Sequence, residues 1–387
     1  MNYEEYKKES GHFHLLKLFP SNLDFIQILS VIFLLVIGVS FIYGIGQQIG
    51  GNTYENMWKK QIVWITMGGF LWLFFTFFFD YRALKKWSLP LYAKSIFLLL
   101  AVFIWSSKIN DAHRWFSIGS SSIKVQPSEF SKMALIIVNA MILSVNGFSV
   151  NRPVHLSCLI FLNAIPMGLI AMEPDLGASV IIIPVVASMI FTAGLKWRWI
   201  FIVIVVGALS VPVAYPFLKD YQKERIKVFF DPGRDPGNRG WNAMQSELAV
   251  GSGGILGKGF MHGTQHTLGF LPRTVSSTDF IFSVVAEETG FAGSVFVIFL
   301  YVLLISSAVR TALVSPDDFG RYIAIGVATV FFIHSFVNIG MTMRLMPVKG
   351  LPLPLISYGG SFILTSLASL GILQSIYRRS DTTDTGD

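Results

Sequence analysis

Long runs of apolar residues alternate along the chain with short polar connections. About 20 residues of α-helix cross the hydrocarbon core of a bilayer, and about ten segments approach that length. The pattern therefore predicts an all-α polytopic membrane protein with about ten transmembrane helices. These segments lie at 25–46, 61–79, 89–106, 130–146, 154–172, 176–193, 199–217, 280–309, 321–343 and 355–377.

One connection, residues 218–278, is far longer than the others and is rich in glycine and polar residues. Long polar loops between membrane spans are usually functional. We therefore predict a large extracytoplasmic loop between helices 7 and 8. The chain divides into a tail (1–24), helices 1–7 (25–217), the loop (218–278), helices 8–10 (279–378) and a second tail (379–387).

The composition agrees with a membrane protein and narrows its partners. The chain is 53% hydrophobic and 14% charged, with a mean hydropathy of +0.59. The net charge of +7 comes largely from Lys and Arg in short loops, which indicates topology and contact with lipid phosphates rather than nucleic acid. Cys158 is the single cysteine, which excludes a disulfide within the chain and a cysteine-ligated zinc site. No cleavable signal peptide is evident, so the first span is expected to direct insertion.

Positive charge in the short loops predicts the orientation of the helices. Loops on the cytoplasmic side of a membrane carry an excess of Lys and Arg. This places both termini in the cytoplasm and the 218–278 loop outside it, although Lys59, Lys60, Lys108 and Arg114 fall on the outer side. The residues that set the bias are Lys7, Lys8, Lys17, Arg82, Lys85, Lys86, Arg152, Lys196, Arg198, Arg310, Arg321, Arg378 and Arg379.

The unusual polar sequence falls in four loops on the predicted outer face. They are 107–128, the turn around Glu-Pro-Asp-Leu-Gly, the large 218–278 loop with the Ser-Ser-Thr-Asp-Phe-Ile-Phe segment that follows it, and 344–361. A channel needs polar groups along its whole path, whereas loops gathered on one face can form one site. The pattern favours a single extracytoplasmic site.

A series of ordered motifs lies in these loops and the adjoining segments. They are Arg114-Trp115, Gln126-Pro127-Ser128-Glu129 with Lys132, Pro174-Asp175-Leu176-Gly177, Tyr221-Gln222 with Arg225-Ile226, Asp231-Pro232, Gln245-Ser246, Gly251 to Gly259, Thr278-Asp279-Phe280, Glu287-Glu288, Pro352-Leu353-Pro354 and Ser357 to Gly360. Over nearly the whole chain, these motifs resemble the SEDS family, the RodA and FtsW group of peptidoglycan glycosyltransferases. Gly263-Thr264-Gln265 is more similar to the RodA branch.

The resemblance implies an inverting glycosyltransferase that polymerises lipid II into glycan strands and releases undecaprenyl diphosphate. Its place would be the outer face of the bacterial cytoplasmic membrane, in cell elongation and rod shape. A class B penicillin-binding protein and the elongation machinery are the partners that the resemblance implies. The family's essential Asp maps onto Asp279.

The residue type and position of Asp279 also fit this chemistry without the family resemblance. A sugar hydroxyl is a poor nucleophile, and a carboxylate can act as its general base. Ionisable groups at the mouth of a membrane span are costly and therefore suggest function. The competing interpretation is that Asp279 caps the helix that follows it.

The leaving diphosphate needs fixed positive charge or a metal. Arg and Lys match phosphate oxygens, and four of them lie in the motifs: Arg114, Lys132, Arg225 and Lys258. Glu129 stands three residues before Lys132, so the two can pair either as a structural ion pair or at the substrate. No cofactor is evident, and the histidines lack zinc-type spacing. Mg²⁺ or Mn²⁺ is the alternative source of charge.

The remaining motif residues are interpreted as tuning or structural groups: Glu287, Glu288, Trp115, Gln245 and Ser246. The glycines at 251–259 predict either a loop that approaches sugar or phosphate closely, or a flexible surface turn. Arg273, Arg344 and Lys349 depart from the family pattern and add positive charge to the predicted active face. Two other functions stay open at this point: a lipid-linked precursor flippase, and a non-catalytic scaffold for a transpeptidase.

Overall fold

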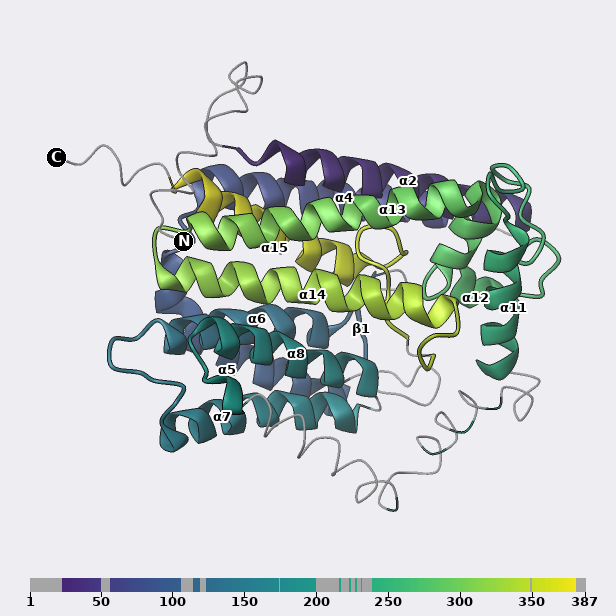
Figure 1. Ribbon diagram of the computed structural model, residues 1–387. Coiled ribbons are helices and arrows are strands. Elements are labelled where there is room, and N and C mark those ends of the chain that lie inside the picture. The colour runs from purple at the N-terminus through teal and green to yellow at the C-terminus, as the bar shows by residue number, and fades with distance from the viewer. Residues whose placement is uncertain are drawn as a thin grey trace.

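The protein is a bundle of long helices in a computed structural model (Figure 1). The structure describes residues 23–49, 56–105, 114–118, 123–173, 175–199, 239–348 and 350–380, together with Pro216, Lys223, Lys227 and Asp231. The helices are α2 (Phe25–Ile49), α4 (Met57–Leu73) with its π-helical end η3 (Phe74–Phe78), α5 (Ala83–Trp105), α6 (Pro127–Leu143), α7 (Pro153–Met172), α8 (Leu176–Thr192), α11 (Arg239–Ser252), α12 (Arg273–Ser276), α13 (Ile281–Val314), α14 (Asp318–Thr342) and α15 (Gly360–Arg378).

Among the described residues, seven helices are long and apolar enough to cross a membrane, namely α2, α4 with η3, α5, α7, α13, α14 and α15. Predicted spans also coincide with α6 and α8, which are 17 residues each. The predicted span at 199–217 lies almost wholly outside the described residues. The multi-pass helical fold is therefore confirmed, while the predicted number of ten helices stays a prediction.

Burial distinguishes the inner helices from the outer ones. In α15, 78% of the most apolar window is buried, against 17% in α4 and 22% in α7. Large apolar side chains such as Phe78 and Phe161 are exposed on the outer helices, as expected where lipid replaces water. On the inner helices, small polar residues such as Ser366 and Ser369 are buried, and they let the helix backbones approach closely.

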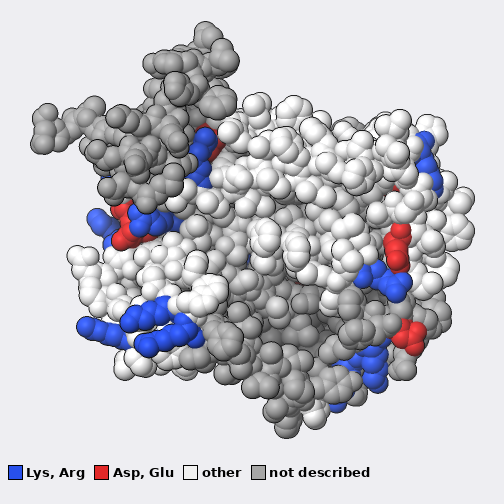
Figure 2. All heavy atoms as spheres, viewed as in Figure 1, with Lys and Arg blue, Asp and Glu red and all other residues white. Residues whose placement is uncertain are grey.

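On one face of the bundle, charged side chains gather towards the two ends (Figure 2). On the face shown in Figure 2, Lys and Arg lie towards the two ends and the surface between them is uncharged. At one end, the Asp24 carboxylate contacts Arg310 at 2.6 Å and accepts a bond from Ser307, while its backbone pairs with Gln374. These contacts hold the start of α2 against the ends of α13 and α15. The candidate site lies at the opposite end.

A small hairpin at that opposite end departs from the all-helical prediction. β1 (Phe116–Ile118) pairs antiparallel with β2 (Ile123–Val125), with Phe116 opposite Val125. Ser361 at the start of α15 donates to the Lys124 carbonyl and accepts from the Gln126 backbone. The hairpin therefore fixes the entry to α6 against α15.

Candidate active site

Polar loops from distant parts of the chain converge at one end of the bundle. The Arg114 Nε donates to the Glu173 carbonyl at 2.8 Å, which joins the segment before β1 to the end of α7. The Gln126 Nε2 donates to the Asp175 carboxylate at 3.2 Å, which joins the start of α6 to the start of α8. The Asp175 charge also acts on Asp279. The structure thus brings the segment around residues 114–126, the turn between α7 and α8, and the turn that carries Asp279 to one end of the bundle.

Asp279 lies in the turn that leads into α13. Three consecutive carbonyls of this turn each accept a bond from another element. The Tyr358 backbone donates to Ser277 at 2.9 Å, and the Ser357 hydroxyl donates to Thr278 at 2.6 Å. The Asn338 amide donates to the Asp279 carbonyl at 2.9 Å. Three hydrogen bonds from other segments therefore hold the backbone that carries Asp279.

The alternative interpretation of Asp279 as a helix cap is wrong. The N-cap position of α13 is Phe280, and no side chain caps this helix. By contrast, Asp175 caps α8, because its carboxylate accepts from the Ala178 backbone at 3.1 Å. Nothing in the helix start therefore accounts for a carboxylate at position 279.

The surroundings of the Asp279 carboxyl favour its protonated form. Desolvation, and to a smaller extent the negative charge of Asp175, raise the pKa of Asp279 from 3.8 to about 7. Within the described part of the chain, no donor forms a hydrogen bond with this carboxyl group. Gly350 faces it, since a Cβ at that position would lie 3.3 Å from Oδ2. A carboxyl group with these properties can exchange a proton near neutral pH.

Glu173 is a second unusual carboxyl group that the sequence analysis did not single out. Its side chain is fully buried, and neither carboxyl oxygen has a hydrogen-bond partner among the described residues. Burial, and then the charge of Asp175, raise the pKa of Glu173 to about 8, while Arg114 opposes the shift. The available signal was a lone acid directly before the Pro-Asp-Leu-Gly motif at the end of an apolar span.

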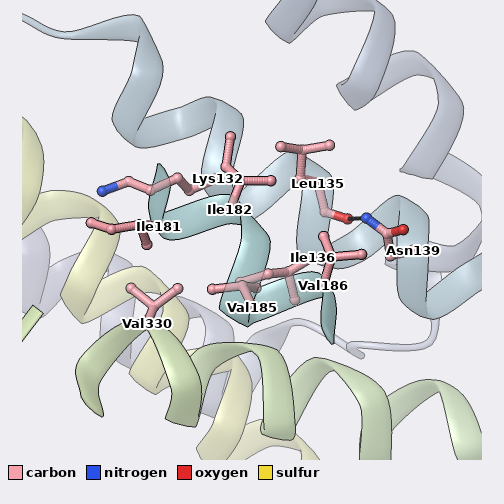
Figure 3. A pocket seen from close by; sticks show the side chains of 9 residues that line it. All are labelled: Lys132, Leu135, Ile136, Asn139, Ile181, Ile182, Val185, Val186 and Val330. Atoms are coloured by element: carbon pink, nitrogen blue, oxygen red, sulfur yellow. Dashed lines mark hydrogen bonds between the residues drawn. The ribbon is translucent and has the colours of Figure 1, made fainter. Parts of the chain in front are cut away.

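The predicted pair between Glu129 and Lys132 is confirmed and is buried. The Lys132 Nζ lies 2.8 Å from Glu129 Oε2 and 3.0 Å from His334 Nε2, and it also lies over the Phe362 ring. The stem of Lys132 lines a small, mostly apolar cavity between α6, α8 and α14 (Figure 3). Contact of either residue with the substrate stays a prediction.

Lys258 is engaged with Glu287. Its Nζ lies 2.6 Å from Glu287 Oε1, and this carboxylate also accepts from the Thr264 backbone and hydroxyl and from the Gln265 backbone. Glu287 is fully buried, whereas Lys258 is partly exposed. A role for Lys258 towards the diphosphate stays a prediction, but its amino group already has a partner.

Glu288 and the glycines complete this structural cluster. Glu288 accepts from the backbones of Met261 and Gly263. Helix α13 is interrupted at Gly290 (φ 68°), and the glycine-rich loop crosses the interruption. A Cβ at Gly253 or Gly257 would lie 2.1 Å from a carbonyl of α13, so side chains there are excluded by this helix. These glycines approach α13 closely, while the predicted approach to sugar or phosphate stays a prediction.

Some of the other predicted residues have contacts or burial that the structure describes, and the rest lie outside its described side chains. The Ser246 hydroxyl donates to the Thr342 carbonyl at 2.8 Å and ties α11 to the end of α14, and Gln245 is buried beside it. Trp115 is half-buried directly before β1. Arg344 pairs with Glu247 at 2.8 Å. The predictions that fall outside the described residues or side chains concern Arg225, Arg273 and Lys349.

Among the described side chains, no three His, Cys, Asp or Glu residues are placed to hold a metal ion. His266 and Glu288 lie 3.6 Å apart, but His266 is buried beside Glu287, and desolvation lowers its pKa to about 4.

Comparison with known proteins shows the family of this chain. The family model of the FtsW/RodA/SpoVE cell cycle proteins matches residues 22–382. The chain belongs to the FtsW/RodA/SpoVE family. It is 39% identical over 299 residues to the peptidoglycan glycosyltransferase MrdB of Escherichia coli (strain K12), covering 76% of this chain and 79% of MrdB. It is 31% identical to the peptidoglycan glycosyltransferase RodA of Treponema pallidum (strain Nichols), covering 93% of this chain and 98% of that protein.

Solved structures of this family have the same fold. A structure described as the structural coordination of polymerization and crosslinking by a peptidoglycan synthase complex matches with a TM-score of 0.79 and 30% identity, over 93% of this chain and 98% of that chain. The rod shape determining protein RodA of Thermus thermophilus matches with a TM-score of 0.68 and 26% identity, with the same coverage. The family resemblance seen in the loop motifs is thus confirmed over nearly the full length.

Proposed function

We propose that this chain is an inverting glycosyltransferase that polymerises lipid II into glycan strands, with Asp279 as the general base. The observation that carries the proposal is the position of the Asp279 carboxyl group, which lies against Gly350 and near Asp175, where desolvation raises its pKa to about 7. Membership of a family whose named relatives are peptidoglycan glycosyltransferases supports the substrate class.

In the proposed reaction, the 4-hydroxyl of the acceptor sugar attacks the anomeric carbon of the donor. Its proton passes to the Asp279 carboxylate as the new glycosidic bond forms. The bond from the anomeric carbon to the diphosphate breaks, and its electron pair leaves with undecaprenyl diphosphate, so the configuration inverts. A base with a pKa near the working pH is both partly ionised and basic enough to accept the proton.

The charge of the departing diphosphate requires cations close to Asp279. Arg114 is one proposed cation, and its guanidinium contacts the end of α7 close in sequence to Asp175. Arg225 and Lys258 stay proposals for the same task, and a divalent cation is the alternative to them. Lys132 is buried with Glu129 and His334, so we assign it to the scaffold around the site rather than to the diphosphate.

The site is proposed to face outwards from the bacterial cytoplasmic membrane, with both termini in the cytoplasm. A class B penicillin-binding protein is the proposed partner, in line with the synthase complex that shares this fold. An impermeant maleimide tests the orientation on whole cells, with a Cys158→Ala background. Leu256→Cys, at an exposed loop position, should be labelled and Lys85→Cys should not. Labelling at 85 alone would overturn the orientation.

The enzymatic proposal is tested by Asp279→Asn in proteoliposomes with labelled lipid II. The change keeps the size of the side chain and removes proton acceptance, so polymerisation should fall by about 10²–10⁴-fold. Asp318→Asn, at an exposed position at the other end of the bundle, is the matched control and should polymerise normally. A flippase would move lipid II without a product strand, and a scaffold would be indifferent to the substitution. Normal polymerisation by folded Asp279→Asn protein would rule the base out.

A further inference from the structure

Asn338 is a fully buried amide on α14 that contacts both walls of the candidate site. Its Nδ2 donates to the Asp279 carbonyl at 2.9 Å and to the Leu351 carbonyl at 2.7 Å. Both neighbours are acceptors, so only the NH₂ end of the amide can face them. The orientation of the side chain is therefore fixed by its surroundings.

The two carbonyls belong to the two segments that enclose the Asp279 carboxylate. One is the turn that carries Asp279 itself. The other is the loop in which Gly350, the neighbour of Leu351, faces Asp279 Oδ2. One amide thus holds both the residue and the backbone opposite it. Loss of this amide would release both sides together.

The other end of the Asn338 amide supports a role beyond packing. Its Oδ1 is buried and has no hydrogen-bond partner in the described part of the chain. An unpaired buried acceptor costs about 1–3 kcal/mol, so this amide is not an optimal choice for stability alone. One turn earlier on α14, His334 contacts the Pro352 carbonyl at 3.2 Å, so the same helix holds this loop at a second point.

We propose that Asn338 is a positioning residue for glycosyl transfer: by bonding the Asp279 and Leu351 carbonyls at once, it sets where the base lies relative to the loop that faces it. The inference rests on the proposed function, in which Asp279 is the base. Asn338 itself is fully buried and does not touch substrate.

The test is steady-state polymerisation by the full-length protein in proteoliposomes, with lipid II as the probe. A displacement of about 1 Å at a catalytic group can cost about 10²-fold in rate, so Asn338→Ala should lower kcat by about that factor with little change in KM. Asn338→Asp has the same shape but cannot donate to both carbonyls, and should lose kcat similarly. The matched control is Asn163→Ala, since Asn163 is a buried amide that pairs with Asn139 between α6 and α7.

A second readout separates positioning from a general loss of folding. Asp175 acts on the Asp279 carboxyl from the start of α8, while the described residues Asn338 and Gly350 present no charge to it. If the turn that carries Asp279 and the loop at 350–351 separate, water reaches the carboxyl group. The desolvation that raises the pKa of Asp279 then weakens, so the acid limb of the kcat profile moves to lower pH. Destabilisation alone, as in Asn163→Ala, leaves this limb in place.

The outcomes decide between the two proposals. The positioning role is supported if Asn338→Ala loses kcat and its acid limb moves to lower pH. If the alanine protein does not fold, the same result in Asn338→Asp supports it. Wild-type kcat and an unchanged limb in either folded variant would overturn it, even where Asp279→Asn is inactive. Activity in Asp279→Asn would instead overturn the proposed function.

Discussion

Asp279 and Glu287 lie eight positions apart at the same end of the protein, yet their carboxyl groups have opposite surroundings. Glu287 accepts bonds from Lys258, from the Thr264 backbone and hydroxyl, and from the Gln265 backbone. Asp279 receives no such bond from the described residues and instead lies near the negative charge of Asp175. A carboxylate that is fully bonded stabilises a fold, whereas one left without donors can take up a proton. Burial by itself does not identify the catalytic acid or base.

The largest effect on stability is expected at Glu287. Glu287→Ala leaves Lys258 and the donors of residues 264 and 265 without their acceptor. Each buried donor left without an acceptor costs about 1–3 kcal/mol, so the melting temperature in detergent should fall clearly. Asp279→Asn should melt like the wild type. Equal melting temperatures for all three proteins would contradict the structural assignment of Glu287.

A smaller effect, confined to pH dependence, is expected at Asp175. Its negative charge raises the pKa of Asp279, so removing that charge should lower this pKa. Asp175→Asn keeps most of the helix-capping ability at the start of α8. The acid limb of polymerisation should therefore move to lower pH, measured as the fraction of maximal kcat/KM retained at each pH. A limb that moves to higher pH would contradict the proposed electrostatics.

A separate effect, on the pH dependence of stability, is expected at Glu173. The folded protein keeps a proton on Glu173 up to a pKa of about 8, whereas the ordinary value is 4.5. Since the folded state binds the extra proton in this window, stability should fall as pH rises from 4.5 to about 8. Glu173→Gln mimics the protonated form and should flatten the dependence of melting temperature on pH. If the melting temperature of Glu173→Gln falls with pH as steeply as that of the wild type, the assignment of this pH dependence to Glu173 is contradicted.

Much of the fold was predictable because membrane helices follow from long apolar segments. The convergence of the polar loops was also predictable, since alternating spans place alternate loops on the same face. The hairpin at 116–125 was missed because strands of three residues carry too little periodicity. Glu173 was missed because a single acid beside Pro-Asp is typical of a turn.

The partners of the charged residues could not be predicted from the sequence. Lys258 meets Glu287 because α13 is interrupted at Gly290 and the glycine loop packs across it. Lys132 meets His334 across 202 positions of sequence. Asn338 carries no motif, and its contacts with Asp279 and Leu351 depend on how α14 packs. Each of these pairings is a property of the tertiary structure.

The central claim, that Asp279 acts as a base with a raised pKa, is tested most directly by the pH dependence of kcat/KM for wild-type polymerisation of lipid II. The ionised carboxylate is the active form, so the rate should rise with pH through a single ionisation near about pH 7. A rate that stays maximal down to the ordinary carboxyl range, near about pH 4, would contradict the claim.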